Sequence, residues 1–143
     1  MSQSYIPQSL QRRVTQKHQH RCSYCRTPEA IIGDPLTIDH ILPEALGGET
    51  SEENLCLACW SCNLRKQKRI TAIDPNTGQT TRFFHPNQQV WTEHFSWSED
   101  DVMIVGLTAT GRTTISALQM NRPSLLKARR IWRLSGWNPV ESK

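Results

Sequence analysis

Apolar residues recur along the chain with two spacings, and each spacing predicts a type of element. Intervals of three and four residues near a proline are typical of helices, whereas short β-branched or continuously apolar runs are typical of strands. Helices are expected over residues 9–19, 60–70, 111–120 and 123–136. Strands are expected over residues 36–42, 55–58, 91–97 and 102–107, the last two forming a β-hairpin. This mixture predicts an α+β fold.

A change of pattern near the middle predicts how the chain is divided. The turn sequence DPNTG at 74–78 is followed by a polar stretch as far as Gln89. We therefore expect a first domain over residues 1–71, a connector over 72–90 and a C-terminal α+β extension over 91–143, packed on the first domain. The extension would consist of the hairpin and the last two helices. A length of 143 residues suits one compact domain with such an appendage.

The formal net charge of +4 is small, but the charges are segregated. Three runs, over residues 8–21, 60–69 and 127–133, each contain cations and no acid. One such run is usually the solvated face of a helix, but three of them favour a polyanionic partner. The N-terminus has no apolar core typical of a secretion signal, and no apolar run reaches the roughly 18–20 residues that cross a bilayer. We expect a cytoplasmic protein without a membrane partner, and the sequence gives no indication of its oligomeric state.

The cysteines are arranged as two C-x2-C pairs, Cys22 with Cys25 and Cys59 with Cys62. Each pair can present two thiolates to one tetrahedral ion, so the four together predict a zinc site. Such a site has no open position for water or substrate, which makes it structural rather than catalytic. Ordinary buried cysteines or a redox pair are the alternatives. Cys56 lies in an apolar run and is expected to be a packed thiol outside the zinc site.

The residues between and after the pairs form a pattern of their own. In order, they are Asp39, His40, Pro43, Gly47, Gly48, Asn54, Leu55, Cys59, Cys62, Asn63 and Lys66. This pattern resembles the HNH endonucleases, also called His-Me finger or ββα-metal nucleases, in the subgroup with zinc knuckles. The resemblance covers roughly residues 20–70, and it departs from the commonest pattern where Asn63 replaces a histidine, as in the HNN variant.

The resemblance implies a ββα-metal finger stapled by the four-cysteine zinc site, and divalent-metal-dependent hydrolysis of DNA phosphodiester bonds. It assigns to Asn54 the role of fixing the catalytic loop, although the residue type alone would equally suit a turn. His40 suits a general base, because a histidine side chain accepts protons near neutral pH. Asp39 and Asn63 offer oxygen ligands, which favour Mg²⁺ or Mn²⁺ as the catalytic ion.

Four basic residues are candidates for contact with nucleic-acid phosphates. They are Arg65 and Lys66, after the predicted metal ligand, and Arg129 and Arg130 in the last helix. A solvated helix face remains the alternative for these side chains. The tryptophans of the C-terminal half are expected to form a core rather than base-stacking platforms. The histidines other than His40 are expected to be structural or exposed.

A second hypothesis is a zinc-stabilised module that binds nucleic acid without catalysis. Asn63 favours this hypothesis, since an amide oxygen is a weaker ligand than imidazole. The presence of Asp39, His40 and Asn54 favours the nuclease.

Overall fold

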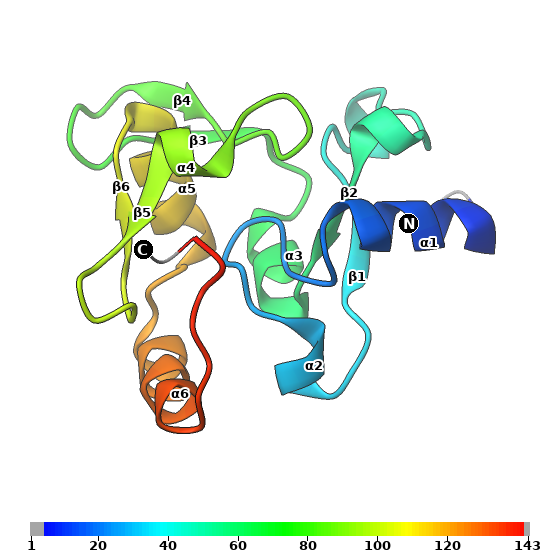
Figure 1. The fold of residues 1–143 in the computed structure, drawn as a ribbon. Coiled ribbons are helices and arrows are strands. Elements are labelled where there is room, and N and C mark those ends of the chain that lie inside the picture. Colours follow the sequence, from blue (N-terminus) through cyan, green and yellow to red (C-terminus); the bar gives the residue numbers. More distant parts are fainter. Residues whose placement is uncertain (1–4, 142–143) are drawn as a thin grey trace. The chain divides into compact units, whose positions relative to one another are not determined.

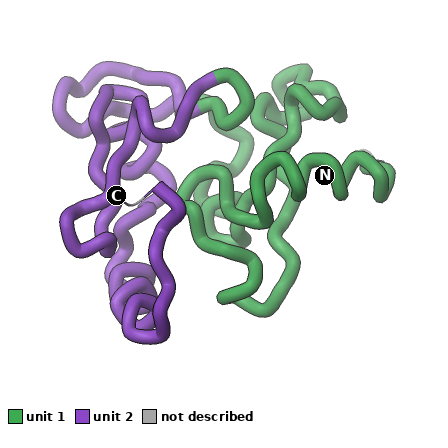
Figure 2. The backbone as a smooth tube through the Cα atoms, viewed as in Figure 1, with its two compact units in different colours: residues 1–70, 85–88 green, residues 71–84, 89–143 purple. Residues whose placement is uncertain are grey.

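The chain was analysed as a computed structural model, which describes residues 5–141. The chain divides into two compact units (Figure 2). Unit 1 comprises residues 1–70 and 85–88, and unit 2 comprises residues 71–84 and 89–143. Each unit therefore has its own core and is described separately. Within residues 5–141, no helix combines the length and the apolar character that crossing a membrane requires.

Unit 1 contains two antiparallel strands followed by a helix, which is the ββα arrangement predicted from the sequence (Figure 1). The elements are α1 (Gln8–Lys17), α2 (Glu29–Ile32), β1 (Thr37–His40), the 3-10 turns η1 (Glu44–Leu46) and η2 (Glu52–Asn54), β2 (Leu55–Ala58) and α3 (Trp60–Lys66). In the β1–β2 register, His40 lies opposite Leu55 and Asp39 lies opposite Cys56. The predicted α+β fold is confirmed.

The core of unit 1 forms where α1 packs on β2. Pro7 precedes the helix, and Leu10 and Val14 lie one turn apart on its buried face. These two side chains pack with Leu55 of β2 in one apolar cluster. All four residues of β2 are buried, so this strand is covered on both faces, unlike a strand with alternating polar positions.

Asn87 anchors the segment 85–88 to unit 1. Its Nδ2 donates hydrogen bonds to the backbone oxygens of Glu52, Glu53 and Leu55, at 2.9–3.2 Å. Its Oδ1 lies 3.1 Å from Nε2 of His18, at the C-terminal end of α1. Burial lowers the pKa of His18 to about 4, so the ring is neutral at physiological pH. His18 is therefore structural, as expected.

The described part of unit 2, which ends at residue 141, contains two hairpins and three helices. Its elements are β3 (Thr71–Ile73), β4 (Thr80–Arg82), α4 (Trp91–His94), β5 (Phe95–Trp97), β6 (Ile104–Gly106), α5 (Ala109–Leu118) and α6 (Pro123–Leu134). The β5–β6 hairpin and the last two helices confirm the predicted extension. The first half of the strand expected over 91–97 is instead the short helix α4. The β3–β4 hairpin begins at Thr71, the last residue expected for the first domain, and otherwise lies in the range expected for the connector. The three-part division stays a prediction.

The tryptophans of unit 2 pack against one another and against Phe95, with Trp91 buried and the other three half-buried. Trp91 stacks on Phe95 with ring centroids 5.0 Å apart, and Trp97 contacts Trp91 and Trp137 at 5.9 Å each. Edge-to-face and offset geometries of this kind stabilise aromatic clusters. The rings therefore form a core, as the sequence predicted.

Arg129 does not fit the phosphate contact expected of it. It is 1% exposed, and its guanidinium donates hydrogen bonds to the backbone oxygens of Val102 and Met120, at 2.9 and 2.8 Å. The same group lies 5.2 Å from the ring centroid of Trp97. Arg129 thus joins α6 to the aromatic core, whereas its neighbour Arg130 is exposed.

Candidate active site

The four predicted zinc ligands are brought together in unit 1. Each of the four sulfurs of Cys22, Cys25, Cys59 and Cys62 lies within 4.8 Å of the others, and all four residues are buried. The Sγ atoms of Cys25 and Cys59 are 3.7 Å apart. Two sulfurs about 2.3 Å from one tetrahedral zinc ion would lie roughly 3.8 Å apart. The cluster therefore fits a structural zinc ion.

Local structure explains how each pair converges. Cys59 is the N-cap of α3, and its Sγ accepts a hydrogen bond from the backbone nitrogen of Cys62 at 3.4 Å. The other pair, Cys22 and Cys25, lies in a turn that two hydrogen bonds hold to Leu57 of β2. The backbone nitrogen of Ser23 donates to the backbone oxygen of Leu57, and the backbone nitrogen of Leu57 donates to Oγ of Ser23. Hydrogen bonding from Cys22 lowers the pKa of the Cys25 thiol well below its usual value, whereas burial raises the pKa of Cys22 and hydrogen bonding within the cluster raises that of Cys62. Negative charge on a sulfur is the state that a metal ion requires.

Cys56 lies outside this cluster. It is fully buried, and its Sγ lies 3.7 Å from the hydroxyl of Tyr24 and 3.8 Å from Oδ2 of Asp39. Burial raises the pKa of this thiol far above its usual range. Cys56 is therefore a neutral packing residue.

His40 ends β1 and its ring is held by the loop that follows. Nε2 lies 2.9 Å from Oγ1 of Thr50 and 4.0 Å from Oε1 of Glu44. The residue is only 5% exposed, so its ring has little freedom to rotate. These contacts orient one ring nitrogen toward the loop.

Asn54 ties the two ends of that loop together. Its Oδ1 accepts a hydrogen bond from the backbone nitrogen of Leu42, at 2.8 Å, and its Nδ2 donates to the oxygens of Leu42 and Glu49, at 2.9 and 2.8 Å. Gly48 is needed at this point because a Cβ there would overlap the Leu42 carbonyl oxygen. The asparagine amide suits this position because one atom of the group accepts a hydrogen bond while a second atom donates two.

Asp39 lies on the opposite face of β1 from His40, as alternation along a strand requires. It is buried, and its Oδ2 lies 3.2 Å from Nζ of Lys66 and 3.1 Å from the hydroxyl of Tyr24. Burial raises the pKa of Asp39 above its usual value, and the ammonium of Lys66 opposes this shift. Nζ of Lys66 also donates to the backbone oxygen of His40 at 3.0 Å.

Asn63 and Lys66 lie three residues apart on the same face of α3, and this face lies against β1. Nδ2 of Asn63 donates a hydrogen bond to Oγ1 of Thr37 at 2.9 Å. The amide oxygen, Oδ1, takes no part in this bond and is the atom that could coordinate a cation. Arg65 is half-buried and donates to Oγ of Ser61 at 2.9 Å. The helix therefore presents Asn63 and Lys66 inward.

Three residues around the site were not singled out by the sequence. Thr50 contacts the ring of His40, and Tyr24 contacts the carboxylate of Asp39. Glu44 begins the 3-10 turn η1 after Pro43, so its approach to the ring of His40 depends on how the chain turns at the end of β1. The sequence likewise has no signal for Thr50 or Tyr24. Their contacts depend on how the loop after β1 and the Cys22–Cys25 turn pack against that strand.

Comparison with known proteins addresses the same segment. Residues 22–69 match the family model described as HNH endonuclease. This segment is an HNH domain. It spans about a third of the chain and includes every residue of the site described above. No curated protein and no solved structure matches the chain.

Proposed function

We propose that this protein is a divalent-metal-dependent endonuclease that hydrolyses DNA phosphodiester bonds. The observation that carries the proposal is the fixed ring of His40, at the end of a strand in the HNH domain and oriented by a loop that Asn54 closes. Such a group is suited to take a proton from an attacking water molecule.

The contacts of His40 indicate how it would act. If Nε2 carries the proton and donates to Oγ1 of Thr50, Nδ1 is left as the acceptor for a proton from water. Asn54 acts on this step indirectly, because it fixes the backbone between His40 and Thr50. Because the ring of His40 is buried and cannot easily rotate, it is held in the orientation that the proton transfer requires.

Asp39 and Asn63 would hold the catalytic cation, for which Mg²⁺ and Mn²⁺ fit the oxygen donors. When bound, such an ion stabilises negative charge on the phosphoryl oxygens. The carboxylate of Asp39 already has a cationic partner in Lys66, at 3.2 Å. A metal ion at Asp39 would compete with this ammonium for the carboxylate, and a Lys66 displaced in this way could contact a phosphate.

Arg65 of α3 and Arg130 of α6 are proposed as further phosphate contacts. Arg130 is exposed, and the hydrogen bond of Arg65 to a serine hydroxyl leaves other guanidinium donors available. Arg129 is omitted from this set because its buried guanidinium is bonded to backbone oxygens within unit 2. Lys66 is equally buried, so it can contact a phosphate only if it leaves Asp39.

The ion pair between Lys66 and Asp39 favours a second candidate function. If Lys66 remains on Asp39, the HNH domain would bind nucleic acid without cleaving it. The two functions differ in one observable: strand breaks accompany binding only in the first.

The deciding experiment measures nicking of supercoiled plasmid by the purified protein with Mg²⁺ or Mn²⁺. His40→Ala is expected to lower the rate by about 10²–10⁴-fold, since it removes the general base. Circular dichroism and zinc content are compared in parallel to confirm that the fold is intact. His94→Gln, which alters a histidine of unit 2 bonded to Thr108, is the matched control and should cleave normally.

Cleavage by His40→Ala at the rate of the unaltered protein would exclude the proposed mechanism. Salt-dependent DNA binding without strand breaks, in either metal ion, would support the non-catalytic function instead.

A further inference from the structure

The outward surface of α1 has a composition that its structural role does not explain. Leu10 and Val14 fix the helix to β2, so the opposite side faces solvent. We call this side, together with His20 in the turn that follows the helix, the outer face of α1. Its side chains line one shallow groove, and they are Gln8, Gln11, Arg12, Thr15, Gln16 and His20.

These groups are amides, a guanidinium, a hydroxyl and an imidazole, and the imidazole of His20 lies 3.2 Å from the carboxylate of Glu29. Gln8, Arg12 and Gln16 follow one another at intervals of four residues, so they form a row along the helix. Nε2 of Gln11 donates to the backbone oxygen of Ile6 at 2.8 Å, which leaves the Oε1 of that amide as an acceptor. Amides and guanidinium groups are the side chains that pair with base edges in the major groove of DNA.

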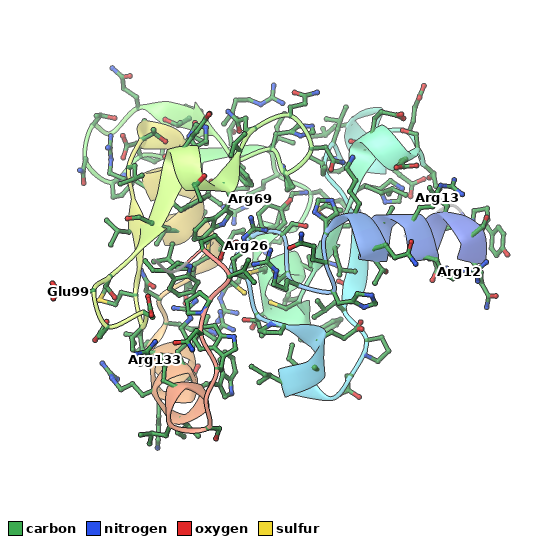
Figure 3. All side chains as sticks on the ribbon, in the orientation of Figure 1. Arg12, Arg13, Arg26, Arg69, Glu99 and Arg133 are labelled. Carbon is green, nitrogen blue, oxygen red and sulfur yellow. The ribbon has the colours of Figure 1, made fainter. Side chains whose placement is uncertain are left out.

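The charge of the helix points to the same ligand. Residues 8–21 contain no acid, whereas a helix that is only solvated commonly carries acids in its first turn. Arg13 is paired with Glu52 at 3.1 Å on another side of the helix from Arg12, as Figure 3 shows. Arg12 and Lys17 are exposed and leave unopposed positive charge on α1.

We propose that the outer face of α1 binds duplex DNA in its major groove, with Arg12 at the centre of the contact. This inference rests on the proposed function, because it assigns the substrate contact of the same enzyme. An α-helix fits the major groove of B-form DNA, whereas the major groove of duplex RNA is too narrow for it.

The test uses the His40→Ala protein, so that binding is measured without cleavage, and fluorescence anisotropy of short labelled duplexes at several salt concentrations. Arg12→Ala in this background should weaken binding at least about fivefold and reduce the slope of log affinity against log salt by about 1. Arg13→Ala removes the same charge from the same helix and is the matched control. It should bind within about twofold of the parent, since Arg13 is already paired with Glu52.

Two further comparisons test the groove assignment. The double change Gln8→Ala and Gln16→Ala should keep the salt slope and reduce the differences in affinity among duplexes of different sequence. Duplex RNA of the same sequence should bind more weakly than DNA. Equal effects of Arg12→Ala and Arg13→Ala, equal affinity for RNA, or no binding of DNA by the parent would each overturn the inference.

The two proposals fail in different ways. If the protein with intact His40 does not nick plasmid but Arg12 still governs binding, the catalytic proposal is wrong and the α1 contact stands. If nicking occurs and Arg12→Ala binds like the parent, only the α1 contact is wrong.

Discussion

The hydroxyl of Thr50 lies within hydrogen-bond distance of Nε2 of His40, at 2.9 Å. Replacing Thr50 with Val removes this contact and preserves the shape of the side chain. One neutral hydrogen bond contributes about 0.5–1.5 kcal/mol, and 1.36 kcal/mol corresponds to a tenfold change in rate. We therefore expect Thr50→Val to slow plasmid nicking about three- to tenfold under single-turnover conditions.

Thr50→Ser is the control for this prediction, because it keeps the hydroxyl and should restore most of the rate. The melting temperatures of both variants should remain close to that of the unaltered protein. Equal nicking rates for the Val and Ser variants would show that the Thr50 hydroxyl does not position His40.

At the scale of elements, α6 depends on one buried cation. The guanidinium of Arg129 donates to the backbone oxygens of Val102 and Met120 and to Oδ1 of Asn121. The oxygens of Val102 and Met120 are bound by different guanidinium nitrogens, Nη1 and Nη2, whereas a lysine has a single nitrogen and cannot reach both positions. Each unpaired buried acceptor costs about 1–3 kcal/mol. Arg129→Lys should therefore lower the free energy of unfolding of unit 2 by about 1–3 kcal/mol or more, measured by urea denaturation and tryptophan fluorescence.

The neighbouring change Arg130→Lys is the matched control, because Arg130 is exposed and such surface changes usually stay within about 0.5 kcal/mol. A similar small effect of both changes would show that the buried hydrogen bonds of Arg129 contribute little to stability.

Arg129 also illustrates which features of an element can be predicted from sequence. The helix itself was predictable, because Pro123 and Gly136 bound a periodic apolar pattern. Its cations at 127, 129, 130 and 133 are distributed around the helix, so the pattern does not indicate which one faces inward. That depends on where the β5–β6 hairpin packs, which is a long-range contact.

The candidate site shows the same division between local and long-range information. The pairing of β1 with β2 and the convergence of the two C-x2-C pairs were predictable, since motif spacing determines them. The ion pair of Lys66 with Asp39 was not, because it depends on the rotation of α3 against β1. Alternation along β1 explains why Asp39 and His40 face opposite sides.

At the scale of the whole molecule, the two units differ in what stabilises them. Unit 2 has an extensive aromatic cluster. In unit 1, the four-cysteine cluster connects the Cys22–Cys25 turn to the start of α3. Structural zinc sites of this kind contribute directly to folding free energy, at about 10–16 kcal/mol in isolated zinc-finger peptides. Unit 1 should therefore depend on zinc, and unit 2 should not.

We expect a chelator to remove about one zinc ion per chain, as such a closed site binds one ion, and to unfold unit 1 while unit 2 stays folded. Four of the five tryptophans lie in unit 2, and the fifth, Trp60, is already 71% exposed. Helical and strand signals in far-UV circular dichroism should therefore fall, while near-UV tryptophan signals persist. Added zinc should reverse the change.

Cys22→Ser should reproduce the effect of the chelator, because three thiolates hold zinc more weakly than four. Cys56→Ser is the matched control: it alters a buried cysteine of the same unit outside the cluster, so this variant should still contain zinc. Metal analysis and thermal unfolding of both variants distinguish loss of the ion from loss of packing. If Cys22→Ser retains a full zinc content and its melting temperature, the four-cysteine cluster is not the zinc site that stabilises unit 1.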